Sequence, residues 1–128
     1  MVVFCDPVGP EGLVGSDFAE VVAGLVGQDY ESLQYLFFLV GPDDEVRQAY
    51  ESHIAQHLPL AAVRKVEGNP GYGPTQNAAA RLVEGDNGLF LFLHDDVCLA
   101  SNAVSELVTE LSRSNAAVVG PKLVQWDD

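Results

Sequence analysis

Two adjacent acids, Asp95 and Asp96, directly follow an apolar run and are the sharpest chemical feature of the sequence. Side chains alternate along an extended chain, so the two carboxylates should point in different directions. One can then hold a divalent metal ion while the other accepts hydrogen bonds from ligand hydroxyl groups. The alternative is a pair of solvated acids near the N-terminus of a following helix. The acid pair alone leaves both interpretations open.

Other polar residues have simpler interpretations. His94 either ligates a metal through its imidazole or fills the end of the strand. His53 and His57 are four residues apart, but no carboxylate completes an H-E-x-x-H motif, so we predict surface positions for both. Asp43 and Asp44 follow a glycine–proline break and are predicted to cap a helix.

The sequence alternates short apolar runs with helical patterns, which predicts the order β-α-β-α-β-α-β-α-β. The predicted strands are Val2–Cys5, Gln34–Val40, Ala61–Val66, Gly88–Leu93 and Ala116–Val119. The predicted helices run from Asp17 to Gly27, from Asp43 or Asp44 through Ile54, from Pro74 to Gly85, and from a cap at Ser101 through Leu111. Arg64 and Lys65 indicate that the third strand lies at a sheet edge or ends there.

This order predicts an α/β fold, a Rossmann-like, doubly wound and mostly parallel sheet with helices on both faces. Ligands of such sheets bind beyond the carboxyl ends of the strands. The segments expected at that edge are Asp6–Pro7, Gly41–Asp44, Asn69–Gly73 and His94–Asp96.

Composition narrows the ligand class. The 128 residues predict one domain, and 19 acidic against 6 basic residues give a net charge of −13. That charge argues against a nucleic acid or an anionic membrane surface as the main partner. No P-loop, dinucleotide-binding glycine motif or nucleophile elbow is present. A diphosphate at this acidic edge would therefore need a divalent metal between it and the carboxylates.

The two cysteines and the N-terminal residues indicate the cellular compartment. Cys5 and Cys98 have no metal-ligand spacing and lie among apolar residues, so we predict two small buried side chains in a reducing compartment. The N-terminus has no basic segment typical of a signal peptide, and no apolar run approaches the length of a membrane span.

Several segments, in order, resemble the nucleotide-sugar-binding half of family 2 glycosyltransferases, which have the GT-A fold. Leu25–Tyr30 is similar to the family's L-x-x-Q-x-Y segment at the end of the first helix. Asn69–Ala79 is similar to its N-x-G segment and following helix, and Phe90–Val97 to the strand leading into its D-x-D motif. Val119–Leu123 matches a common continuation, so the resemblance covers nearly the whole chain.

The resemblance implies roles for individual residues. Asp96 stands at the acid that ligates Mn²⁺ or Mg²⁺ on the diphosphate, and Asp95 at a position that contacts the ribose or sugar. Asp6 lies where relatives contact the nucleotide. The remaining implied nucleotide-sugar-binding residues are Asn69 and Gly71, in the loop beside the pocket, and Asn77 on the following helix. The implied activity is metal-dependent, inverting transfer of a sugar from a nucleoside-diphosphate sugar to an acceptor hydroxyl.

Two features depart from the family pattern. His94 replaces the first acid of the D-x-D motif, which leaves one fewer carboxylate near the metal. The family usually ends its second strand with D-(D/N)-G-S, whose first acid reads the nucleobase. Here that acid is missing or displaced to Asp43, so the sequence does not identify the base.

We expect residues 1–128 to be the donor-binding part of a longer enzyme, inactive alone, because relatives carry the acceptor site and catalytic base further along. Leu93–Asp96 and Gly120–Leu123 with Trp126, in an acidic Ala/Val/Gly-rich chain, resemble large actinobacterial glycosyltransferases with later membrane spans. The acceptor implied is a carbohydrate, such as a cell-wall polysaccharide, or a lipid-linked glycan. The expected location is the cytoplasm, or the cytoplasmic face of a membrane reached through segments outside this chain.

Two other functions fit the same sequence. A non-catalytic GT-A-like module without donor binding would explain His94 and the missing base-reading acid. A receiver-like or flavodoxin-like α/β domain fits the element order, with Lys122 following the fifth predicted strand. Receiver domains, however, carry an acid pair after the first strand, where Asp6 stands alone.

Overall fold

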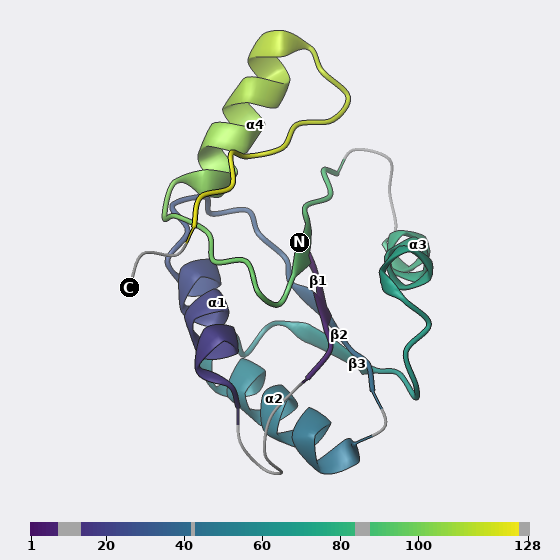
Figure 1. The fold of residues 1–128 in the computed structure, drawn as a ribbon. Helices are drawn as coiled ribbons and strands as arrows, with labels where there is room; N and C mark the ends of the chain where they lie inside the picture. Colours follow the sequence, from purple (N-terminus) through teal and green to yellow (C-terminus); the bar gives the residue numbers. More distant parts are fainter. Residues whose placement is uncertain (8–13, 42, 84–87, 126–128) are drawn as a thin grey trace.

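The computed structural model describes residues 1–7, 14–41, 43–83 and 88–125. Strands and helices alternate along this part of the chain (Figure 1). The strands are β1 (Val2–Cys5), β2 (Leu36–Leu39), β3 (Ala62–Lys65) and β4 (Phe92–His94). The helices are α1 (Ser16–Val26), α2 (Asp44–His57), α3 (Tyr72–Leu82) and α4 (Ala103–Ser114).

The four strands form one parallel sheet in the order β3-β2-β1-β4. Cys5 pairs with Leu39, and Leu39 pairs with Lys65, so β1, β2 and β3 end in register. On the other side of β1, His94 pairs with Phe4. All four carboxyl ends therefore meet at one edge. The edge position predicted for the third strand from Arg64 and Lys65 is confirmed, since β3 closes one side of the sheet.

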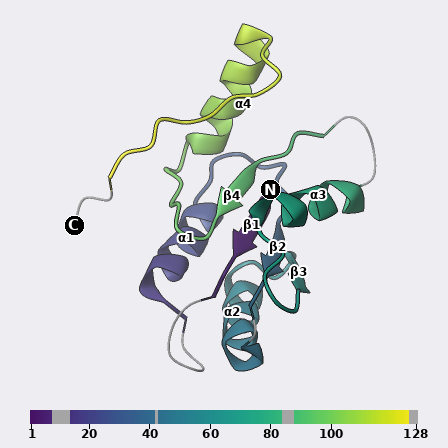
Figure 2. The same ribbon diagram turned by 45° about the vertical axis from the view of Figure 1, so that its right-hand side comes forward.

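Helices cover both faces of the sheet, as predicted. Figures 1 and 2 show α1 and α2 on one face and α3 on the other. Alternation along each strand divides the core in the same way, because Val3 and Phe37 pack with the α1 and α2 side chains while Val2 and Phe38 pack with Ala79 of α3. Burial of these apolar side chains is the main stabilising term for the sheet and its three helices.

Helix α4 is attached differently from the other three. Val104 is its buried apolar residue, and Leu107, Val108 and Leu111 are half-buried. In Figures 1 and 2 the helix projects away from the sheet, and the chain after it runs back beside it. The link to the body is polar. Gln28 Nε2 donates to the carbonyls of Gly24 and Ala100 at 2.9 and 2.7 Å, and Gln28 Oε1 accepts from the Val104 N–H at 3.1 Å.

Three predictions about the second half of the chain are wrong. Ala116–Val119 is not a strand, because this run follows α4 away from the sheet, and Val118 remains 86% exposed. The fourth strand is shorter than Gly88–Leu93 and includes His94. The fourth helix is preceded by Asn102 rather than Ser101, and the Gln28 side chain satisfies the Val104 N–H there.

The third helix begins and ends earlier than predicted. Its first residue is Tyr72, with Pro74 in the first turn, and it ends at Leu82. Pro74 has no N–H to lose in that turn, which is why it is tolerated there. The predicted end at Gly85 lies outside the described residues.

The cysteine prediction holds for Cys5 and fails for Cys98. Cys5 is fully buried in β1, and burial, with the Asp95 charge second, raises the pKa of its thiol well above its usual value. Cys98 is exposed, because it follows β4 in an irregular segment where the next residue, Leu99, takes the buried position.

Within the described ranges, no helix combines the length and the apolar character needed to cross a membrane.

Candidate functional site

The carboxyl edge of the sheet brings together residues from distant parts of the sequence. Asp6 follows β1, and Asp95 follows β4. The Asp6 N–H donates to Asp95 Oδ2 at 2.9 Å, and Asp6 Oδ2 accepts from Asn69 Nδ2 at 3.1 Å. Three of the predicted site residues therefore form one hydrogen-bonded group, which we call the edge network (Asp6, Asn69 and Asp95).

The edge network is negative and partly removed from water. Burial raises the pKa of Asp95 above its usual value, and N–H groups of Asp6 and Asp95 oppose that rise by donating to the carboxylate. The charges of Asp96 and Asp6 raise the pKa further. None of the ion pairs among the described residues involves Asp6, Asp95 or Asp96. Within the described ranges, the acids of this edge therefore have no ion-pair partner.

Asp95 and Asp96 differ in exposure, although both lie in a turn after β4 and not in the extended chain from which the difference was predicted. Asp95 is half-buried and held by the edge network, whereas Asp96 is exposed. In the described part of the chain, no group of three or more His, Cys, Asp and Glu side chains has the arrangement of a metal site. The groups available to ligate a metal ion here are thus the oriented carboxylate of Asp95 and the exposed carboxylate of Asp96.

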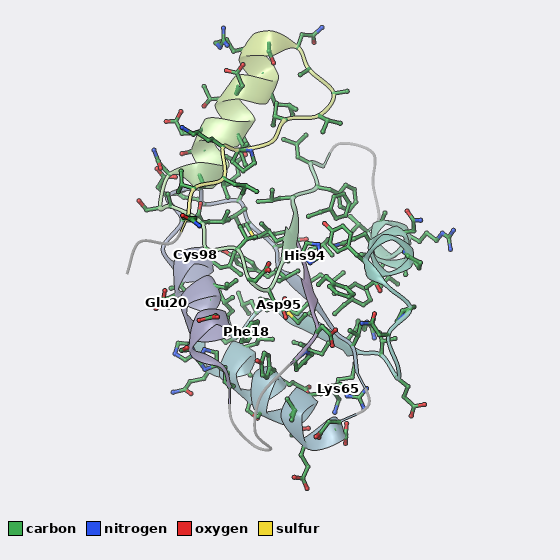
Figure 3. All side chains as sticks on the ribbon, in the orientation of Figure 1. Phe18, Glu20, Lys65, His94, Asp95 and Cys98 are labelled. Carbon is green, nitrogen blue, oxygen red and sulfur yellow. The ribbon has the colours of Figure 1, made fainter. Side chains whose placement is uncertain are left out.

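His94 fills the end of β4 and packs toward α3. Its ring stacks on Tyr72 with 4.1 Å between ring centroids and 11° between planes, and it meets the Phe4 ring edge-on at 5.8 Å. Figure 3 labels His94 and Asp95 at the end of the strand. Of the two interpretations left open by the sequence, the packing one describes this conformation.

The loop before α3 is organised by its own side chains. Asn69 Oδ1 accepts from the Gly71 N–H at 2.9 Å, while the amide nitrogen of the same side chain reaches Asp6. Gly71 has φ +93°, a conformation that glycine adopts without a steric penalty, and it directly precedes α3. The Thr75 hydroxyl donates to the Gly71 carbonyl at 2.8 Å. Asn69 thereby fixes the start of α3 relative to the end of β1.

Comparison with known families then identifies the chain. The model of the family described as "Glycosyl transferase family 2" matches residues 15–128. The chain belongs to this family. Among curated proteins, no match was found.

A solved structure supports the fold of this family 2 chain. The crystal structure of S. aureus TarS is similar with a TM-score of 0.59 and 19% sequence identity. The similarity covers 89% of the present chain and 20% of the TarS chain. The four-stranded parallel sheet flanked by helices is thus the GT-A fold, as the sequence predicted, and the chain spans about a fifth of the length of TarS.

Two other predicted site residues of the family 2 chain lie outside the edge network. Asp43 is the N-cap of α2, where its Oδ1 accepts from the N–H groups of Glu45 and Val46 at 3.0 and 3.1 Å. The capping prediction for Asp43 is confirmed. Asn77 lies exposed on α3, and among the described residues it makes no hydrogen bond to the edge network.

Sequence reasoning missed Arg47, the one basic residue that the structure buries within its described part. Arg47 is 7% exposed, and its Nη1 donates to the carbonyls of Gly41 and Val66 at 2.8 and 2.9 Å. The signal was its position on the face of α2 that carries Val46, Tyr50 and Ile54. In the sequence, however, an arginine one residue from an apolar position is usually a solvated side chain.

Proposed function

We propose that residues 1–128 form the nucleotide-sugar-binding part of a metal-dependent, inverting glycosyltransferase. The observation that carries the proposal is the edge network, in which Asp6 joins Asp95 and Asn69 at the carboxyl edge of the sheet. Ligands of open α/β sheets bind at this edge. Membership of family 2 supports sugar transfer as the reaction.

The carboxylates at this edge fit a divalent cation whose coordination shell is completed by the phosphates of the bound nucleotide. Mg²⁺ usually binds one or two carboxylates together with substrate phosphates and water, so a preformed cage of protein ligands is unnecessary. Asp96 would hold the ion, since its carboxylate is exposed next to the oriented Asp95. Bound Mg²⁺ or Mn²⁺ would offset the charge of the departing nucleoside diphosphate.

The remaining residues would position the donor. Asp95 is fixed by backbone N–H groups, so its carboxylate is ready to accept a hydrogen bond from a ribose or sugar hydroxyl. Asp6 and Asn69 would hold the nucleotide beside Gly71 at the start of α3. Asp43 and Asn77 are proposed donor-contacting residues at the periphery, on the evidence of the resemblance alone. We assign no catalytic base within residues 1–128.

The proposed partners follow from this reaction. The donor is a nucleoside-diphosphate sugar, and the acceptor is a carbohydrate or a lipid-linked glycan bound by the longer protein. A cytoplasmic location, at the membrane face for a protein with membrane spans elsewhere, would place the chain where nucleotide sugars are made.

Thermal unfolding with UDP, GDP and dTDP, each with and without Mn²⁺, tests the proposal. A ligand that binds only the folded chain at about 100 times its Kd adds roughly 2.7 kcal/mol to stability. We expect a rise in the unfolding midpoint that needs nucleotide and metal together. The Asp96→Ala variant should lose it, while Asp29→Ala, which removes an exposed acid after α1, should keep it.

Two results would contradict the proposal in different ways. A midpoint that no nucleotide changes would support the non-catalytic GT-A-like module. Metal-dependent binding that persists unchanged in Asp96→Ala would leave donor binding intact and remove Asp96 as the metal ligand.

A further inference from the structure

A second feature of the carboxyl edge is a hollow of about 270 Å³ lined by Gly41, Arg47, Glu67 and Gly68, which we call the β2–β3 hollow. It adjoins the edge network, because a Cβ atom on Gly41 would lie 3.7 Å from Asp6 Oδ1. Sites for small molecules usually measure roughly 300–1,000 Å³. The β2–β3 hollow is therefore suited to one part of a nucleotide sugar, next to the edge network where the donor is proposed to bind.

The floor of the hollow is backbone held in a fixed shape. The Gly41 N–H donates to the Gly68 carbonyl at 2.7 Å, and Gly41 and Gly68 both have positive φ, at +113° and +69°. The buried Arg47 of α2 supports this backbone by donating to the carbonyls of Gly41 and Val66. Three floor carbonyls thus already accept one hydrogen bond each, so part of their acceptor capacity serves to hold the floor itself.

Glu67 is the lining side chain with acceptor capacity to spare. It is exposed, and no hydrogen bond or ion pair in the described ranges engages its carboxylate. An ionised carboxylate accepts hydrogen bonds and donates none. Its carboxylate is therefore suited to a ligand group that donates a hydrogen bond, such as the ring N–H of a neutral base.

We propose that Glu67 reads the nucleobase of the donor and selects bases that carry a ring N–H on their pairing edge. Uracil, thymine and guanine have this N–H. Adenine and cytosine present an unprotonated ring nitrogen there, so only their exocyclic amino group can donate to the carboxylate, and the ring lone pair beside it is repelled. A site built around one polar partner discriminates strongly because the mismatched ligand leaves that partner unsatisfied.

This inference rests on the proposed function and changes which strand supplies the base-reading acid. The resemblance places that acid after the second strand, where Asp43 instead uses Oδ1 to cap α2. Glu67 instead follows β3 and directly precedes Gly68, the residue that pairs with Gly41. Arg47 is a positioning residue, since its Nη1 holds the floor carbonyls of Gly41 and Val66.

Titration calorimetry of the 128-residue chain with Mn²⁺ and UDP, GDP, CDP or ADP tests the inference. We expect UDP or GDP to bind at least about tenfold more tightly than CDP and ADP, a difference of about 1.4 kcal/mol. Methylation of the ring N–H, in 3-methyl-UDP or 1-methyl-GDP, should remove this advantage and will show which base is preferred. Glu67→Gln should bring the four affinities within about threefold of one another.

One control variant separates Glu67 from general effects of charge. Glu106→Gln removes an exposed carboxylate on α4 and should retain both the affinities and the base preference. Asp43→Asn tests the competing assignment, because it keeps a good N-cap while removing the other candidate acid. Since Asp43 is itself a proposed donor contact, this variant can weaken all four nucleotides together, but the ratio between them should stay as in the wild type.

The outcomes distinguish this inference from the function it rests on. Equal binding of all four nucleotides, or loss of preference in Asp43→Asn rather than in Glu67→Gln, would overturn the role of Glu67 and leave metal-dependent donor binding standing. No binding of any nucleotide with Mn²⁺ would overturn both.

Discussion

The backbone N–H of Asp6 donates to Oδ2 of Asp95 at 2.9 Å, although 89 residues separate the two. The bond joins the first residue after β1 to the first residue after β4. The side chain of Asp6 extends the connection to Asn69. One residue thus sets the relative positions of two polar side chains that come from separate loops.

Replacing Asp95 with Asn should stabilise the metal-free chain at pH 7. A carboxyl whose pKa is raised by folding destabilises the folded state once it ionises, so wild-type stability falls as pH rises through that raised pKa. The Asn side chain can still accept the hydrogen bond from Asp6. Differential scanning calorimetry should show a higher midpoint for Asp95→Asn at pH 7, by about 1–4 °C.

The stability difference should shrink at low pH. As the pH falls to and below the ordinary carboxyl pKa of 3.8, Asp95 becomes increasingly protonated in both the folded and unfolded wild-type chain, so its charge contributes less to the difference. The same variant should lose metal-dependent nucleotide binding at pH 7. An unchanged midpoint difference between pH 7 and pH 3.5 would contradict this account of the Asp95 charge.

Replacing Asn69 with Ala should weaken nucleotide binding more than it weakens the fold. The variant loses the bonds to Asp6 and to the Gly71 N–H, both of which lie at an exposed edge. We expect roughly tenfold weaker UDP or GDP binding, about 1.4 kcal/mol, in titration calorimetry. Asn102→Ala is the control, because the Asn102 side chain makes no capping hydrogen bond to α4. Equal losses in the two variants would remove Asn69 from the site.

Replacing Gln28 with Ala should loosen α4 and leave the sheet intact. Gln28 bonds to Gly24, Ala100 and the Val104 N–H, so the variant leaves three backbone groups without this partner. We expect a loss of about 1–3 kcal/mol in urea unfolding and faster hydrogen exchange at the Val104 amide. Gln56→Ala, at an exposed position of α2, should have little effect. Slow exchange at Val104 in Gln28→Ala would show that packing alone holds the helix.

Two glycine substitutions should shift stability in opposite directions. Gly41→Ala places a Cβ on a residue with φ +113°, which should cost about 1–3 kcal/mol. Gly73→Ala lies in the first half of α3, where a Cβ would meet no atom within 4 Å, and should stabilise by up to about 1 kcal/mol. Urea unfolding measures both. A neutral Gly41→Ala would contradict the fixed shape of the hollow's floor.

The sequence was sufficient for the fold class because each buried strand leaves an apolar run. Val2–Cys5 is buried along its whole length, and the predicted strand has the same bounds. Ala116–Val119 has a similar composition but no sheet neighbour, because its place depends on where α4 projects. Hydrophobic runs predict which segments can be strands, whereas pairing depends on contacts between distant residues.

For the candidate site, the sequence predicted positions along the chain better than partners across it. Asp6, Asn69 and Asp95 were placed at strand ends, and the structure brings them together. Nothing in the local sequence shows that a backbone N–H of one acid would orient another. Arg47 and the hollow it supports were missed for the same reason, since three separate segments create them.

Strand β4 carries a consequence for how binding and local order are linked. It contributes three residues at the margin of the sheet, with β1 as its neighbour, and Phe92 is 41% exposed. Asp95 and Asp96 follow it directly, so fraying of this strand would separate the acids from Asp6. A sugar donor that binds both acids would therefore hold β4 against β1. Hydrogen exchange of the β4 amides should then respond most strongly to donor binding.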